Sequence, residues 1–152
     1  MTLRVAVIGV SGIGKHHAKW YHRWGCEVAG FVGTTEESCA RNEEELRRLF
    51  PFTGCGYTDL TSLIDGLAPD IIDVCSPNEM HFEHVSTALD AGCHVLCEKP
   101  LVWNNGSTEI LKMQASQLVE RAETANKILA VCTQYAFAMP QYNELYHDIL
   151  GG

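Results

Sequence analysis

Hydrophobic residues along the chain fall into two alternating patterns. Short apolar runs rich in β-branched residues, typical of strands buried on both faces, occupy residues 3–8, 27–32, 70–75, 93–97 and 127–132. Between them, apolar residues three or four positions apart predict helices over residues 13–24, 36–50, 59–67, 79–91, 104–126 and 143–150, and Tyr57 fits a further short strand. Because strands alternate with helices, the sequence predicts an α/β fold, a doubly wound parallel sheet in a three-layer α/β/α arrangement.

Residues at the ends of the predicted helices suit those positions. Thr34 or Thr35 is expected to cap the second helix, and Asp59 the third, through side-chain oxygens that accept backbone N–H groups. Gly25 and Gly92 each follow a predicted helix as its stop signal. These signals support the helix assignments independently of the hydrophobic pattern.

The turn between the first strand and the first helix is rich in glycine. Residues 9–14 read GVSGIG, a G-x-G-x-x-G frame with serine at its middle glycine position. Glycines let a backbone approach a pyrophosphate, and the following helix N-terminus offers N–H groups and a positive dipole end. We therefore expect dinucleotide binding here, by Gly9, Ser11, Gly12, Ile13 and Gly14, and a valine at position 14 would intrude between helix and pyrophosphate. A tight turn without a ligand is the alternative.

Polar clusters also follow the other predicted strands. They are Gly33-Thr34-Thr35, Ser76-Pro77-Asn78, Glu98-Lys99-Pro100 and Thr133-Gln134-Tyr135. In open parallel sheets, ligands bind beyond the carboxyl ends of the strands, where the strand order switches. We therefore expect these clusters and the glycine turn to lie along one edge of the sheet and to form one binding site.

Composition and charge limit the partners and the compartment. The 152 residues carry a net charge of −8, which argues against nucleic acid or an anionic membrane as the main partner. No apolar run reaches transmembrane length, and the N-terminal run lacks the shape of a signal peptide. We expect the seven cysteines to be reduced thiols in a cytoplasmic protein.

Two segments resemble the Gfo/Idh/MocA oxidoreductases, the family of glucose–fructose oxidoreductase and inositol dehydrogenase. Residues 75–101, CSPNEMHFEHVSTALDAGCHVLCEKPL, are similar to the family's S-x-P-N-x-x-H, A-G-K-H-V and E-K-P motifs. Residues 14–18, GKHHA, are similar to its glycine turn, which usually ends in a His-Ala pair. The resemblance covers nearly the whole chain. It implies a Rossmann domain that binds NAD or NADP, and hydride transfer between the nicotinamide and a sugar, a polyol or a related small molecule.

The resemblance also implies roles for individual residues. Lys99 corresponds to the E-K-P lysine, which lies near the nicotinamide and the reacting oxygen, where a cation stabilises developing negative charge. A surface lysine in a turn is the alternative. The family's proline, here Pro100, often follows a cis bond. His81 corresponds to the P-N-x-x-H histidine, expected to order its loop as a hydrogen-bond donor. The implied cofactor-binding residues are Ser76, Pro77, Asn78, His81, Glu98, Lys99 and Gln134.

The chain departs from the family at the position that distinguishes the two cofactors. An acid after the second strand favours NAD, because it accepts from the ribose hydroxyls and repels a 2′-phosphate. Gly33 occupies that position, so we expect Gly33, Thr34 and Thr35 to line the ribose site, with Arg41 as a source of positive charge. These residues favour NADP slightly. Glu36 or Glu37 could instead replace the acid and favour NAD.

The resemblance also implies a second domain that carries most of the substrate site. Residues 1–135 correspond to the dinucleotide-binding domain, and residues 136–152 to the start of the connection to a second domain that is absent from the sequence. We therefore expect the isolated chain, whether a fragment or a single-domain form, to bind a dinucleotide but to turn over little, since acid/base partners are missing. A non-catalytic nucleotide-binding sensor or remnant is the alternative; a methyltransferase-like domain fits the E-K-P segment poorly. Homo-oligomerisation is left open.

Other candidate residues have simpler interpretations. His16, His17, His22, His81 and His84 are not expected to bind a metal, because no cysteine or carboxylate lies at ligand-like spacing from them. Trp20 and Trp24 fall on the apolar stripe of the first helix and are assigned to the core, as are the thiols of Cys93 and Cys97.

Overall fold

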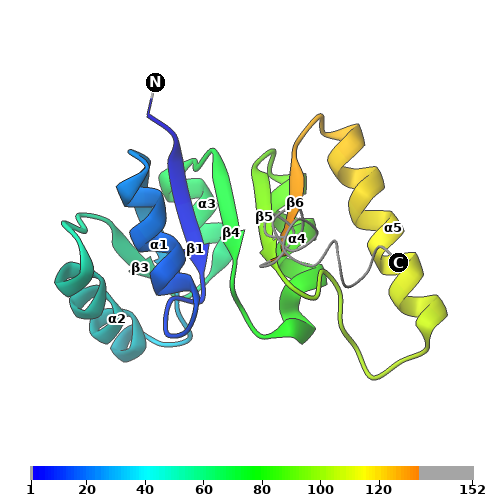
Figure 1. Ribbon diagram of the computed structural model, residues 1–152, viewed down its shortest axis with the longest axis horizontal. Helices are drawn as coiled ribbons and strands as arrows, with labels where there is room; N and C mark the ends of the chain where they lie inside the picture. Colours follow the sequence, from blue (N-terminus) through cyan, green and yellow to red (C-terminus); the bar gives the residue numbers. More distant parts are fainter. Residues whose placement is uncertain (1, 134–152) are drawn as a thin grey trace, which may run out of the picture.

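The computed structural model describes residues 2–133, which form a six-stranded parallel sheet (Figure 1). Its strands, in the spatial order β3-β2-β1-β4-β5-β6, are β1 (Arg4–Ile8), β2 (Glu27–Val32), β3 (Cys55–Tyr57), β4 (Ile71–Val74), β5 (His94–Glu98) and β6 (Leu129–Cys132). The chain builds outward from β1 to β3 and then returns to place β4 on the other side of β1. The predicted doubly wound α/β fold is therefore confirmed, with its switch point between β1 and β4.

Helices cover the sheet on both faces. They are α1 (Gly14–Arg23), α2 (Glu36–Leu49), α3 (Leu60–Leu67), α4 (His81–Asp90) and α5 (Thr108–Thr124), with a 3-10 turn, η1 (Asn78–Met80), before α4. Side chains alternate along β1: Val5 and Val7 pack with residues of α1 and α2, whereas Ala6 and Ile8 pack with residues of α3, α4 and α5. The two resulting apolar cores, one on each side of the sheet, make the three layers. No helix of the described part of the chain is long and apolar enough to cross a membrane.

Most of the predicted end signals operate in the structure. The Thr35 hydroxyl accepts the Ser38 N–H at 3.1 Å, and the Ser38 hydroxyl accepts the Thr35 N–H at 3.0 Å, so both residues cap α2. The Asp59 carboxylate caps α3. Gly25 and Gly92 have φ angles of +81° and +77°, the left-handed conformation expected after a helix.

Several predicted boundaries shift, because local hydrogen bonds compete with the helix or strand. Residues 79–91 are not one helix, since the Met80 N–H donates to the Pro77 carbonyl in a tighter 3-10 turn before α4. Helix α5 begins at Thr108 rather than near residue 104, because the Ser107 hydroxyl caps it. Strand β6 begins at Leu129. The helix predicted over residues 143–150 lies outside the described residues.

The assignment of Trp20 and Trp24 to the core is wrong. They are 52% and 80% exposed. The face of α1 that meets the sheet is centred on Gly14 and Ala18, both buried, because these small residues let the helix pack closely against the strands. Trp20 lies beyond that face, with the Arg23 guanidinium 5.0 Å from its ring centre.

Candidate functional site

A cleft of about 530 Å³ opens at the carboxyl edge of the sheet, at the switch point between β1 and β4. Its walls come from the segments that follow β1, β2, β3 and β4, and from the first turns of α2. They comprise Ile8, Gly9, Val10, Ser11, Val32, Gly33, Thr34, Ser38, Arg41, Asn42, Thr58, Cys75, Ser76, Pro77, Met80 and His84. Thr58 follows β3, so four strand exits from different parts of the sequence converge on one cavity.

The cleft includes only part of the predicted site. Gly9, Ser11, Gly33, Thr34, Ser76 and Pro77 line it. The remaining predicted residues, Gly12, Ile13, Gly14, Thr35, Asn78, His81, Glu98 and Lys99, do not line it, and Gln134 lies outside the described residues. Arg41, Asn42 and Ser38 complete the wall from α2, so the second helix contributes more to the cleft than the pattern of strand exits indicated.

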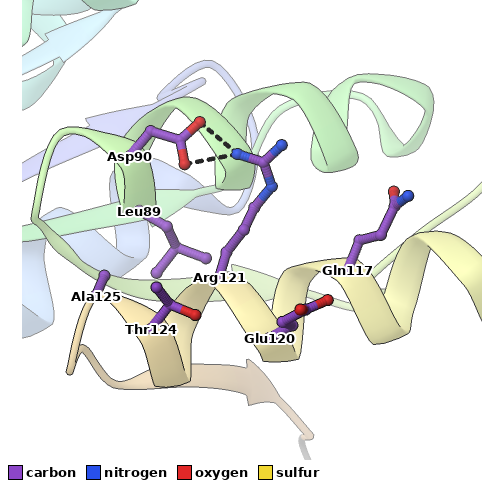
Figure 2. Close-up of a pocket in the computed structure, with 7 residues that line it drawn as sticks. All are labelled: Leu89, Asp90, Gln117, Glu120, Arg121, Thr124 and Ala125. Atoms are coloured by element: carbon purple, nitrogen blue, oxygen red, sulfur yellow. Dashed lines mark hydrogen bonds and ion pairs between the residues drawn. The ribbon is translucent and has the colours of Figure 1, made fainter.

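A second hollow, of about 470 Å³, lies between α4 and α5 (Figure 2). Leu89 and Asp90 come from the end of α4, and Thr124 and Ala125 from the end of α5, so this hollow is at the amino edge of the parallel strands. The Arg121 guanidinium points to the Asp90 carboxylate across it, with an N···O distance of 2.6 Å (Figure 2). The charges of Arg121 and Asp90 therefore neutralise each other, and no residue that lines this hollow follows a strand directly.

The glycines of the turn have different roles. A Cβ on Gly14 would lie 2.2 Å from the Gly9 carbonyl oxygen and 3.0 Å from the Cys75 Cβ, and Gly9 has a φ of +86°. Glycine at both positions is therefore required by the packing of the turn against β1 and β4. A side chain at position 14 was expected to intrude mainly on a pyrophosphate. This expectation needs correction, because such a side chain would first collide with the Gly9 carbonyl oxygen and with Cys75. A Cβ on Gly12 would meet nothing within 4 Å.

The N-terminus of α1 is free to receive an anion. No side chain caps α1, and its first turn contains no acidic residue, whereas side chains cap α2, α3 and α5. The first N–H groups of a helix have no intrahelical partner, and the helix dipole favours negative charge beside them. Together with Ser11 in the cleft wall, α1 offers the arrangement that binds phosphate groups in proteins.

A network of buried charged groups lies under α1, on the face of the sheet next to the turn. His17 Nδ1 is 2.9 Å from Asp73 Oδ2, and His17 Nε2 is 3.3 Å from Glu98 Oε1. Asp73 is fully buried and Glu98 is 8% exposed. The second contact lies within ion-pair distance but lacks hydrogen-bond geometry, so Glu98 Oε1 has no hydrogen-bond partner among the described residues. One imidazole thus connects the ends of β4 and β5 to α1.

Electrostatics favour a charged His17 in this network. The hydrogen bond to Asp73 raises the pKa of His17 above its ordinary value of 6.5, against the lowering effect of burial, and the charges of Asp73 and Glu98 add to the rise. Burial raises the pKa of the thiols of Cys75, Cys97 and Cys132, that of Cys97 to about 12. The neighbouring acids therefore favour the charged form of the His17 imidazole, and burial favours the neutral form of the nearby thiols.

The sequence reasoning about His17 was wrong on one point. It found no carboxylate or cysteine partner at suitable spacing, yet the structure gathers potential ligand atoms of His17 with those of Asp73 and Cys75, and with those of Glu98 and Cys132, each set within 4.8 Å. These partners come from β4, β5 and β6. The available signal was Asp73 itself, because a charged residue in the middle of an apolar strand requires a buried partner.

His81 joins the cleft to the E-K-P segment. Its ring is fully buried, with Nδ1 2.7 Å from the Pro100 carbonyl oxygen and Nε2 2.9 Å from the Ser76 carbonyl oxygen. Ser76 lines the cleft, and the Lys99–Pro100 bond is cis. The contacts are those of the loop-ordering residue that was expected. They hold the exposed Lys99 next to the loop that forms the cleft wall.

The stability contributed by His17 is expected to decline as the pH rises. Because the folded pKa is raised, this contribution is complete below the unfolded value of about 6.5 and is lost as the pH passes through the higher folded value. Urea unfolding between pH 6 and pH 9 should show the free energy of unfolding of wild type falling toward that of His17→Gln. His16→Gln, at an exposed neighbour, is the control. A gap between wild type and His17→Gln that is constant with pH would contradict the charged assignment.

Comparison with known proteins identifies the family of this fold. The family model described as "Oxidoreductase family, NAD-binding Rossmann fold", GFO_IDH_MocA, matches residues 3–133. The chain belongs to the Gfo/Idh/MocA oxidoreductase family. It is a NAD-binding Rossmann domain of that family.

Relatives in this family act on sugars, by their names. The chain is 31% identical to D-glucoside 3-dehydrogenase of Escherichia coli (strain K12) over 151 residues, covering 90% of this chain and 36% of the relative. It is 34% identical to D-xylose 1-dehydrogenase (NADP(+)) of Hypocrea jecorina over 104 residues, covering 66% of this chain and 25% of the relative. Among solved structures, UDP-N-acetylglucosamine 3-dehydrogenase of Acidithiobacillus ferrooxidans gives a TM-score of 0.70 at 26% identity, covering 86% of this chain and 38% of that one. The chain therefore spans well under half the length of these relatives.

Proposed function

We propose that this chain is the cofactor-binding part of a dehydrogenase that transfers a hydride between a nicotinamide cofactor and a sugar, a polyol or a related small molecule. The observation that carries the proposal is the contact of His81 with both Ser76 and Pro100, which ties the cleft wall to the E-K-P segment. A dinucleotide site and a candidate catalytic cation are thereby held in fixed relation. The family membership and the names of the relatives support the substrate class.

The geometry of the cleft supports dinucleotide binding. The turn packs so closely that a Cβ on Gly9 would lie 2.8 Å from the Cys75 carbonyl oxygen, which leaves backbone and the small Ser11 to face the cavity. The uncapped α1 would hold the pyrophosphate, and Gly33 and Thr34 would line the adenosine ribose site. The nicotinamide, when bound, supplies the hydride acceptor or donor.

Lys99 is the candidate catalytic residue of this chain. It is exposed, and its backbone N–H donates to Glu98 Oε2 at 3.1 Å, which fixes the turn while the ammonium group extends into solvent. A positioned ammonium can hold the substrate oxygen and stabilise negative charge that develops on it. Glu98 in turn is anchored to His17, so the network under α1 supports the position of the lysine.

A reducing compartment agrees with the thiols. All seven cysteines are unpaired, including the exposed Cys55, and this supports a cytoplasmic location. A small-molecule substrate, rather than nucleic acid or a membrane surface, agrees with the net charge of −8.

Replacing Lys99 is expected to impair turnover far more than cofactor binding. In the full natural polypeptide, Lys99→Met should lower kcat by about 100-fold, the effect of removing one group that stabilises transition-state charge. Lys112→Met, at an exposed lysine of α5, is the control. Turnover with a panel of sugars and polyols is followed by the absorbance of the reduced nicotinamide, and cofactor affinity by calorimetry. Cofactor binding with no turnover on any panel member would favour the non-catalytic nucleotide-binding module instead.

A further inference from the structure

The end of the cleft formed by β2 and α2 suits a phosphate on the adenosine ribose. We propose that this chain binds NADP(H) in preference to NAD(H), and that Arg41 is the residue that contacts the 2′-phosphate. The proposal rests on the proposed function, because it concerns the same cleft. It goes further by selecting one of the two cofactors and by naming the residue that makes the selection.

The position that would carry a NAD-selecting acid is occupied by a glycine that lies close against the start of α2. Gly33 follows β2 in the cleft wall, and a Cβ on it would lie 2.8 Å from Cys39 Sγ and 3.1 Å from Ser38 Oγ. Both neighbours belong to the first turn of α2, which is fixed there by its reciprocal cap with Thr35. An acid at this position accepts from the ribose hydroxyls and repels a 2′-phosphate. Gly33 presents no carboxylate to the cleft, and the side chains at the start of α2 leave little room for one.

The acids that could replace it do not reach the cleft. Glu36 and Glu37 lie in the first turn of α2, both exposed, and neither lines the cavity. Hydrogen bonding to its own backbone N–H and to the Thr35 hydroxyl lowers the pKa of Glu37, whose residue lies at the helix start and not in the cleft wall. The alternative that the sequence left open, NAD selection by one of these two residues, is thus disfavoured by their placement.

Arg41 does line the cleft, and its charge is free. It forms no ion pair among residues 2–133, whereas Arg47 and Arg48, farther along the same helix, pair with Glu43 and Glu44 at 2.7 and 3.3 Å. A guanidinium presents a fork of N–H donors that matches phosphate oxygens.

The rest of the wall near Arg41 is polar but carries no negative charge. Thr34 and Ser38 contribute hydroxyls 3.3 Å apart, and the buried Asn42 contributes an amide. No carboxylate lines the cleft within the described residues, although acidic residues outnumber basic ones 19 to 11 in the sequence. An acidic protein thus has a cleft whose permanent charge is positive, and this supports a ligand with an additional phosphate.

The test compares two fragments of the cofactor that differ only in the 2′-phosphate. Calorimetric titration of 2′,5′-ADP and 5′-ADP, at one ionic strength, measures the contribution of that phosphate directly. Wild type should bind 2′,5′-ADP at least about tenfold more tightly, a difference of about 1.4 kcal/mol. Arg41→Gln should reduce the ratio to less than about threefold. Arg48→Gln, which removes an exposed arginine of the same helix outside the cleft, should keep the wild-type ratio.

The outcomes separate this proposal from the proposed function. If wild type binds both nucleotides within threefold of each other, the preference for NADP is rejected. If Arg41→Gln keeps the full preference, the assignment of Arg41 is rejected. In both cases the proposed dinucleotide site stands. If the folded protein binds neither nucleotide, both proposals are rejected. Titration of NADP and NAD themselves should give the same order of affinity, and tighter binding of NAD would overturn the cofactor preference.

Discussion

Gly14→Val is expected to unfold the protein or to lower its free energy of unfolding by more than about 3 kcal/mol. Even the first added carbon would lie 2.2 Å from the Gly9 carbonyl oxygen, and 3.0 Å from both Cys75 Cβ and Val7 Cγ1. The added carbon would lie between the backbone of the turn and a buried strand. The steric clash could therefore be removed only if α1 moved away from β1 and β4. Thermal and urea unfolding followed by circular dichroism measure the loss.

Gly12→Val is the matched control for this prediction. The same substitution two residues earlier in the turn meets nothing within 4 Å at the Cβ, so we expect a stability change below about 1 kcal/mol. If Gly14→Val were as stable as Gly12→Val, the packing role assigned to Gly14 would be wrong. A requirement for glycine at that position would then have to come from the ligand.

Replacing His81 with leucine is expected to cost about 3 kcal/mol or more. The imidazole is fully buried, and its two nitrogens lie 2.9 and 2.7 Å from the carbonyl oxygens of Ser76 and Pro100. Leucine fills a similar volume but offers no hydrogen-bonding group to either of these partly buried carbonyls, and losing such a contact costs about 1–3 kcal/mol. Urea unfolding gives the free energy, and calorimetry on the same variant shows whether the cleft still binds a dinucleotide.

His84→Leu provides the comparison one helical turn farther along α4. His84 Nδ1 is 2.9 Å from the Ser76 hydroxyl, which can turn toward water when the imidazole is lost. We expect a cost of about 1 kcal/mol for this single hydrogen bond. Equal destabilisation by the two variants would show that His81 does not hold the two loops together.

Local sequence signals predicted the fold well, because they depend on near neighbours in the chain. Apolar runs and helical spacing predicted the strands and helices, and Thr35, Asp59, Gly25 and Gly92 predicted where helices begin or end. Alternation of strands with helices was then sufficient for the doubly wound sheet, since parallel neighbours require crossover connections. The convergence of strand exits on one cleft follows from that topology.

Tertiary packing decided which residues of each strand-exit cluster line the cleft. Whether Gly14 makes room for a ligand or for β1 and β4 depends on how closely α1 approaches the sheet. The structure likewise shows that Arg41 lines the cleft and that Glu36 and Glu37 do not. The position of a residue along a helix gives the direction in which its side chain projects. Only the distance between helix and sheet decides which groups that side chain contacts.

Long-range contacts were beyond local reasoning. His17 meets Asp73 and Glu98 only because β4 and β5 lie side by side beneath α1, and Trp20 is exposed because Ala18 already fills the contact with the sheet. The sequence determined the type of fold and the edge of the sheet at which the cleft opens, because these follow from periodicity and chain order. The pairing of buried charges and the choice between neighbouring side chains required the tertiary structure, because both depend on distances between segments far apart in the chain.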